Sequence, residues 1–393
     1  MLLPKNGWTR RLVVLLCSYS ALQLAAWHAL QAVCSRGRGP SRCNALYRPL
    51  LGWPEPAVPL EVELRRADAE HEDAEEFLQS FLPNATRWPL ATAGGVDVLA
   101  AVVTTRRRMG RYLTRTVAAL IREAAKSNHG LRIAALVCNA DPDPSEFVEA
   151  RKLASLLPTV EFYAANASGP PARPKYVRTR DVRLVKELAD YVACLRAASA
   201  LQSETRFYLL LEDDALLVED GLFYLSTIIR QLREPAKRRR TSHVMLYHPT
   251  RLRGIPWIIS AACLTKSSQC RRFSKAGLDR TLLPLRVLFG AFYSTAVFFL
   301  LFGLGHDLYS SVRLRLTGGS VHLNGHPESC CMPAVLYTRE NFGAAIEHFA
   351  GSRAYAGHSK DHVLDELPRA LELVAYEADT DLVRHTGVYS TIR

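Results

Sequence analysis

Between residues 96 and 214, apolar runs of strand length alternate with stretches of helical periodicity. Val96–Thr105, Leu131–Asn139 and Phe207–Leu211 are predominantly apolar runs, which is typical of buried strands. Tyr112–Ala125 and Asp181–Leu201 lie between them and have the spacing of helices. Strands that alternate with helices predict an α/β fold with a largely parallel sheet, whose ligands bind at the carboxyl ends of the strands.

Three consecutive carboxylates, the acidic triad Glu212, Asp213 and Asp214, follow the strand in the segment FYLLLEDDALLV. Acids crowded at the end of a buried strand repel one another unless positive charge lies beside them. Helix-capping acids in a solvated loop are one interpretation, and a receiver-type phospho-Asp pocket is another. A divalent cation held by hard oxygen ligands and shared with a substrate diphosphate explains the crowding best. Thr104 ends the first strand, so it is expected at the same edge of the sheet.

The formal net charge of +12 at pH 7 predicts a basic surface. The basic clusters Arg106–Arg108 and Lys237–Arg240 lack interleaved aromatic residues and any nucleic-acid module signature, so we expect no nucleic-acid partner. Membrane lipid with anionic headgroups or a phosphate-bearing substrate fits these clusters. The nine cysteines form no CxxC pair or Cys/His cluster, which argues against a zinc site.

An uncharged segment near the amino terminus, Leu12–Val33, has the length of one bilayer span, about 20 residues. Basic residues precede it, and we expect residues 1–11 to be a cytoplasmic tail and residues 12–33 a transmembrane signal anchor. The bulk of the chain would then lie outside the cytoplasm. A signal peptide cleaved near Cys34 is the alternative.

A second apolar run, Val287–Gly305, is also long enough to span a membrane, and its alternative is a buried helix of a large domain. Upstream of it, Ile255–Leu264 covers only about half a span at about 1.5 Å per residue.

Six short motifs occur in order along the chain. They are EDD in the acidic triad, DYVACL at Asp190–Leu195, LYHPTRL at Leu246–Leu252, CCMPAVLY at Cys330–Tyr337, SKD at Ser359–Asp361 and LVRHTGVYSTIR at Leu382–Arg393. This ordered set resembles the family of Golgi N-acetylgalactosaminyltransferases that decorate GPI anchors, the family of post-GPI-attachment to proteins factor four. The resemblance extends from about Val96 to the last residue and includes the segment of the second apolar run. The terminal His-x-Gly-x-x-Ser pattern is also similar to the branching N-acetylglucosaminyltransferases of the fourth type.

The resemblance implies a GT-A glycosyltransferase fold interrupted by a membrane hairpin. Residues 34–94 would be a stem, residues 95–250 and 311–393 the two parts of the GT-A fold, and residues 251–310 the inserted hairpin. It implies a multi-pass Golgi membrane protein with a lumenal catalytic domain. The activity implied is an inverting, metal-dependent transfer of GalNAc from UDP-GalNAc to a mannose of the GPI glycan, on GPI-anchored proteins or GPI glycolipid. A non-enzymatic GPI-binding scaffold or trafficking factor is one alternative, and the same enzyme class with another UDP-sugar is the other.

The resemblance also assigns site residues. Mn²⁺ or Mg²⁺ would be held by Asp214 and His385, and the histidine favours manganese. An inverting transfer also needs a carboxylate base to take the proton of the acceptor hydroxyl, and Asp361 is the candidate for it, with a helix-capping acid as its alternative. Donor contacts fall on Thr104, Glu212, Asp213, Asp214, Met332 and Pro333, where Met332 replaces an expected threonine.

The expected topology follows from the metal pair. Asp214 and His385 must face the same side of the membrane, whereas Val287–Gly305 as a lone span would separate them. Ile255–Leu264 is therefore expected to be a partner limb, in a shallow or tilted hairpin rather than two full spans.

Cysteines and basic residues complete the expectations. The resemblance pairs Cys138 with Cys194. Cys330 and Cys331 are adjacent in the sequence, which allows a vicinal disulfide between them, and two adjacent free thiols are the alternative. Lys360, Arg384 and the Arg106–Arg108 cluster are candidate phosphate partners, but we expect solvated surface charge for each of them.

Overall fold

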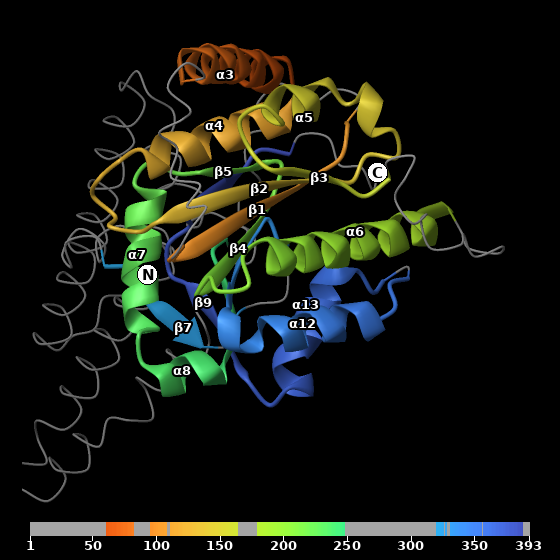
Figure 1. Cartoon of the computed structure of the whole chain (residues 1–393). Helices are drawn as coiled ribbons and strands as arrows, with labels where there is room; N and C mark the ends of the chain where they lie inside the picture. Colours follow the sequence, from red (N-terminus) through yellow and green to blue (C-terminus); the bar gives the residue numbers. More distant parts are fainter. Residues whose placement is uncertain are drawn as a thin grey trace, which may run out of the picture. The chain divides into compact units, whose positions relative to one another are not determined.

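In a computed structural model of the 393-residue chain, the described residues are 60–81, 95–107, 111–163, 179–247, 320–325, 327, 331–355 and 357–387. All of them belong to one compact unit that joins residues 57–254 with residues 310–393 (Figure 1). Both predicted membrane segments, 12–33 and 251–310, lie outside the described residues. Within those residues, no helix combines the length and the apolar character that a membrane span requires.

The centre of the unit is an eight-stranded sheet with the strand order β3-β2-β1-β4-β8-β6-β9-β7. The four strands from β3 to β4 run parallel, as do β6 and β9, whereas β8 and β7 are antiparallel to their neighbours. This mostly parallel α/β sheet confirms the predicted class and fits a GT-A-like fold. The strands are β1 (Val98–Thr104), β2 (Ile133–Asn139), β3 (Thr159–Glu161), β4 (Phe207–Glu212), β6 (Thr241–Met245), β7 (Leu323–Gly325), β8 (Ala334–Thr338) and β9 (Val374–Ala378).

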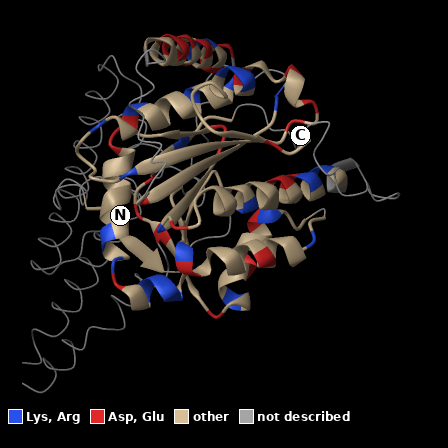
Figure 2. Cartoon of the chain, viewed as in Figure 1, with Lys and Arg blue, Asp and Glu red and all other residues tan. Residues whose placement is uncertain are grey.

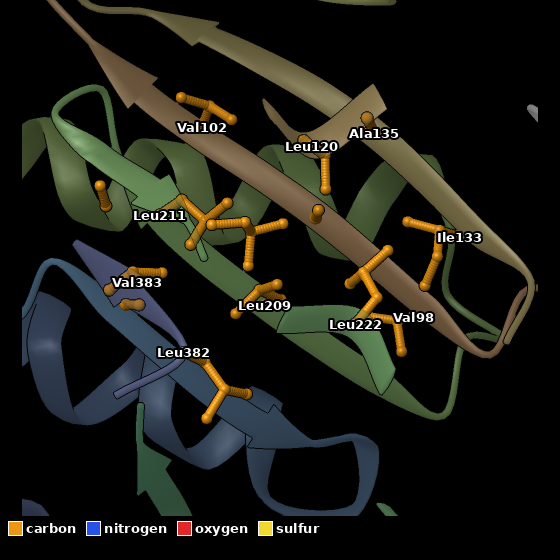
Figure 3. Close-up of a cluster of buried hydrophobic side chains, with 14 of the residues drawn as sticks. Val98, Val102, Leu120, Ile133, Ala135, Leu209, Leu211, Leu222, Leu382 and Val383 are labelled. Carbon is orange, nitrogen blue, oxygen red and sulfur yellow. The ribbon is translucent and has the colours of Figure 1, made fainter. Parts of the chain in front are cut away.

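Helices cover both faces of the sheet (Figure 1). One hydrophobic core contains side chains of α3 (Leu60–Phe81), α4 (Tyr112–Ala124), α5 (Val148–Leu153) and α7 (Gly221–Gln231). The second contains side chains of α6 (Thr179–Leu201), α12 (Arg339–Gly351) and α13 (Lys360–Ala370). Figure 3 shows part of the first core, in which Val98 of β1, Leu209 of β4 and Leu222 of α7 lie together. The remaining elements are the 3-10 helix η2 (Pro144–Glu146), the basic helix α8 (Pro235–Arg240), and a small antiparallel sheet of β5 (Ala215–Leu217) and β10 (Val383–His385).

The structure confirms the three predicted strands, which are β1, β2 and β4, and the two predicted helices, which are α4 and α6. The observed ends differ from the predicted ends by a few residues. The first helix, α3, falls in the range 34–94 that we expected to be a stem. It is rich in acids, whereas α8 is rich in Lys and Arg (Figure 2). Ala74 and Leu78 of α3 are nevertheless buried in the first core, so α3 packs on the folded unit through its apolar side.

The predicted disulfide between Cys138 and Cys194 is present, and it joins β2 to α6 with both residues fully buried. Such a bridge stabilises a fold by about 2–4 kcal/mol. Cys330 lies outside the described residues, so its pairing with Cys331 stays a prediction.

Candidate active site

The acidic triad lies where β4 ends and β5 begins, at the carboxyl edge of the parallel strands. Asp213 and Asp214 are only 3% and 2% exposed. Thr104, the last residue of β1, reaches the same edge, because β1 pairs in parallel with β4. Buried carboxylates require positive charge and hydrogen-bond donors nearby, and the structure provides both.

Asp213 is held by side chains of β1, of the segment that follows β1, and of α4. The Thr104 hydroxyl donates to its Oδ2 over 2.9 Å, and the Arg107 guanidinium forms an ion pair with its Oδ1. The Thr116 hydroxyl donates to its backbone carbonyl over 2.6 Å. Burial raises the pKa of Asp213 in spite of the Arg107 charge. Both of its carboxylate oxygens are therefore engaged within the protein.

Asp214 keeps one oxygen open. Its Oδ2 accepts from Arg107 Nη1 at 3.0 Å and lies 3.3 Å from His385 Nε2, while the Thr386 amide donates to its backbone carbonyl over 2.8 Å. Its Oδ1 is buried without a hydrogen-bond partner. Burial opposes ionisation, but the hydrogen bond with His385 and the charge of Arg107 hold the pKa of Asp214 at about 2.

Glu212, Asp214 and His385 fit a divalent cation, because one ligand atom from each lies within 4.8 Å of the others. Two side chains that share one ion place their ligand atoms within about 4–5 Å of each other, and Asp214 Oδ2 lies 3.3 Å from His385 Nε2. Two carboxylates and one imidazole suit Mn²⁺, and the unpartnered Oδ1 of Asp214 is an available donor. The structure adds Glu212 to the metal ligands predicted from the sequence.

Gly387, the glycine of the His-x-Gly motif, leaves room for this cluster. A Cβ at Gly387 would come within 2.3 Å of Asp214 Oδ2 and 3.2 Å of His385 Nε2. Asp214 Oδ2 cannot move away easily, because Arg107 and His385 hold it. The motif thus supplies both a ligand and the space beside it.

On the opposite side of the triad, α13 brings Lys360 to the acids. Lys360 is buried and forms ion pairs with Glu212 and Glu187. Burial works against its charge, but Glu212 and Glu187 raise the pKa of Lys360 well above its usual value.

Asp361 follows Lys360 in the first turn of α13. Ser359 is the N-cap of this helix, in a capping box with His362, so Asp361 is not its capping acid. Asp361 Oδ1 is enclosed and has no hydrogen-bond partner. Burial raises the pKa of Asp361 to about 6. These are properties of a base that accepts a proton near neutral pH.

The loop predicted to contact the donor sugar meets the triad through its backbone. The Glu212 amide donates to the Pro333 carbonyl over 2.8 Å. Met332 is 3% exposed, and its side chain packs in the second core. Contacts of Met332, Pro333 and Thr104 with a donor stay predictions.

The expectation of solvated surface charge is wrong for Arg107 and Lys360, whose side chains are 13% and 9% exposed. Arg384 is more exposed and bonds to Glu70 of α3. One signal for Arg107 exists in the sequence: it follows β1 as the triad follows β4, and these strands are neighbours. The roles of Glu187, Glu70 and Gly387 were not expected from the sequence.

A comparison with known protein families matches residues 98–384 to the family described as GPI-N-acetylgalactosamine transferase PGAP4. The match covers well over half of the chain. It contains Thr104, the acidic triad and Asp361, and it ends one residue before His385.

Proposed function

We propose, since this chain belongs to the GPI-N-acetylgalactosamine transferase PGAP4 family, that it transfers GalNAc from UDP-GalNAc to a mannose of the GPI glycan. The observation that carries the proposal is the group of Glu212, Asp214 and His385 at the carboxyl edge of the parallel strands. Donor nucleotides bind at this edge in open α/β sheets. The site contains both carboxylates and the cationic side chains of Arg107 and Lys360. A metal cation would pair with the carboxylates, and the negative diphosphate of the donor would pair with the cations.

Asp214 and His385, with Glu212, would hold Mn²⁺ or Mg²⁺, which supplies positive charge against the charge that develops on the leaving UDP. Arg107 fixes the Asp214 carboxylate through Oδ2, so that Oδ1 remains available as a ligand. Lys360 orients Glu212 from the other side. In this arrangement Asp213 has a supporting role, because Thr104 and Arg107 occupy its oxygens.

Asp361 is the proposed base. Its unpartnered Oδ1 would accept the proton of the acceptor mannose hydroxyl as the hydroxyl oxygen attacks the anomeric carbon from the face opposite UDP, which inverts the configuration. With a pKa of about 6, Asp361 is ionised at neutral pH, and it is basic enough to accept a proton there. Loss of such a base reduces rates by about 10²–10⁴-fold.

We place this reaction in the Golgi lumen. The two predicted membrane segments would hold the catalytic unit near a lipid-anchored acceptor, whether a GPI-anchored protein or a GPI glycolipid. The expected basic surface charge would favour an anionic membrane.

Donor turnover by the purified full chain tests the proposal. With Mn²⁺ and a GPI-bearing acceptor extract, we expect UDP release and transfer from UDP-GalNAc, and less from UDP-GlcNAc or UDP-galactose. Asp214→Ala should lower turnover by about 10²–10³-fold, and EDTA should abolish it until Mn²⁺ or Mg²⁺ is restored.

The matched control is Asp73→Ala, because Asp73 lies on the exposed side of α3 and its side chain pairs with surface Arg122. It should retain wild-type turnover. A chain that binds GPI but turns over none of the three donors would support the non-enzymatic scaffold or trafficking factor instead. Preference for another UDP-sugar would keep the enzyme class and replace the donor.

A further inference from the structure

Glu70 of α3 lies between two arginines from distant parts of the chain. Its Oε1 accepts from Arg384 Nη2 over 2.7 Å, and its Oε2 accepts from Arg115 Nη1 over 3.2 Å. Arg66, one turn earlier on α3, donates to the same Oε1 over 3.0 Å. A single carboxylate thus joins α3, α4 and β10.

The contact with Arg384 bears on His385, its neighbour in β10. This strand is only three residues long and pairs with β5, where His385 faces Ala215 next to Asp214. A strand this short has few backbone bonds to fix it. Side-chain contacts of Arg384 therefore contribute to the position of His385 against Asp214.

The contact with Arg115 bears on Arg107. Arg115 is 4% exposed, and its guanidinium lies over the ring of Tyr112 at 5.0 Å from the centroid. The Arg107 guanidinium lies over the same ring at 4.9 Å. Arg107 in turn donates to Asp214 Oδ2, so the contacts of Glu70 approach Asp214 from two directions.

We propose that Glu70 is a positioning residue for the candidate metal site, holding His385 through Arg384 and Arg107 through Arg115 and Tyr112. This inference rests on the proposed function. Glu70 does not touch the donor or the ion in this scheme. It acts on the two groups that contact Asp214 Oδ2, and it makes α3 part of the catalytic unit.

The environment of Glu70 supports this role over that of an ordinary surface ion pair. Its side chain is 26% exposed, while Arg115 is buried and has no closer acidic partner among the described contacts. Burial opposes ionisation of Glu70, but the hydrogen bond and charge of Arg384 lower its pKa. Partly buried charged contacts of this kind keep their geometry better than exposed pairs do.

Titration of the full chain with Mn²⁺ alone, followed by calorimetry or by the electron paramagnetic resonance signal of free Mn²⁺, tests the proposal. Substitution of groups that orient metal ligands weakens metal binding by about 10–100-fold. We expect a weakening of about tenfold for Glu70→Gln. Arg384→Gln breaks the same contact from a half-exposed side chain, and it should give a similar loss even if Glu70→Gln folds poorly.

Glu75→Gln is the matched control, because Glu75 lies on the same helix and bonds to Lys152 and His71 instead. It should bind Mn²⁺ as the wild type does, with a melting temperature close to that of Glu70→Gln. The double variant Glu70→Gln/Arg384→Gln should bind no more weakly than Glu70→Gln, since Glu70→Gln already removes the contact with Arg384.

Three results would count against Glu70. Wild-type Mn²⁺ affinity in Glu70→Gln and Arg384→Gln, with loss in Asp214→Ala, would overturn the positioning role and leave the proposed function standing. An equal loss in Glu75→Gln would show a general effect of α3 and overturn it as well. A wild-type chain that binds no Mn²⁺ would overturn both this inference and the metal-dependent mechanism.

Discussion

The two flanks of the acidic triad neutralise its charge in different ways. On the α4 flank, Arg107 pairs with Asp213 and Asp214, and hydroxyl groups complete the hydrogen bonds of Asp213. On the α13 flank, Lys360 alone faces Glu212 and Glu187, with Asp361 beside it. Lys360 thus faces three acids where Arg107 faces two. Buried carboxylate oxygens without a hydrogen-bond partner remain on both flanks, Asp214 Oδ1 on the α4 flank and Glu187 Oε2 and Asp361 Oδ1 on the α13 flank.

This difference separates two tasks that a transferase site must perform. The α4 flank is more buried and holds the ligand Asp214 in one orientation. The α13 flank is less closed and keeps a carboxylate that can take up a proton. A buried group with satisfied bonds is rigid, whereas one with an open oxygen is available for chemistry.

The largest effect that would separate the flanks is on stability. Arg107→Met leaves the deeply buried Asp213 without its cation and Asp214 with His385 alone, and removing one partner of a buried pair costs about 3–5 kcal/mol. Lys360→Met leaves Glu212 and Glu187, whose side chains are 22% and 27% exposed and can be hydrated. We expect a smaller loss for Lys360→Met, measured as the free energy of unfolding in urea.

The exposed pair Arg122–Asp73 supplies the control for this comparison. Arg122→Met should change stability by at most about 1 kcal/mol. Equal losses for Arg107→Met and Lys360→Met would show that the two flanks are energetically equivalent and would remove the basis of the comparison.

The sheet could be predicted from the sequence because its signals are local. β1, β2 and β4 are continuous apolar runs, and α4 and α6 have helical spacing over three or more turns. β8 could not be predicted in its place, since it comes late in the chain yet inserts antiparallel between β4 and β6. Its pairing depends on contacts that no local pattern encodes.

The site divides in the same way. The triad and His385 belong to short motifs, and a resemblance was enough to bring them together. Glu70 could not be found, because it lies 314 positions from Arg384 in a helix whose sequence resembles a solvated stem. Arg107 and Lys360 were misassigned to the surface because charged residues are usually exposed, and only the tertiary fold shows which ones are buried.

A second, smaller effect is the pH dependence of stability that Asp361 causes. Burial raises its pKa from 3.8 to about 6, so the folded protein binds this proton more tightly than the unfolded chain does. The stability that the proton provides is lost as the pH rises from about 4 to about 6, and above that range the ionised group is a cost. Asp361→Asn should therefore be more stable than the wild type by about 1–3 kcal/mol at pH 7.5 and nearly equal to it at pH 4.

Urea unfolding at the two pH values measures this difference in stability. The pH dependence of turnover tests the same pKa in the wild type. The wild-type rate should fall below about pH 6 as Asp361 is protonated. Asp365→Asn, a carboxylate one turn further along α13, is the control and should show no comparable gain at pH 7.5. An Asp361→Asn protein that is less stable than the wild type at both pH values would contradict the assignment of Asp361 as the buried, unpartnered carboxylate of the α13 flank.

The smallest effect tests whether the α4 flank only holds the triad or also contacts the donor. Thr104→Val removes the hydroxyl that donates to Asp213 Oδ2, with little change in shape, and should cost about 1–2 kcal/mol of stability. Thr116→Val removes the neighbouring bond to the Asp213 carbonyl and should cost a similar amount. The two substitutions differ in one respect, since only Thr104 is predicted to contact the nucleotide. If that contact exists, UDP binds more weakly to Thr104→Val than to Thr116→Val by calorimetry, by several fold. Equal UDP affinities with equal losses of stability would restrict Thr104 to supporting Asp213, and the α4 flank would then be a scaffold alone.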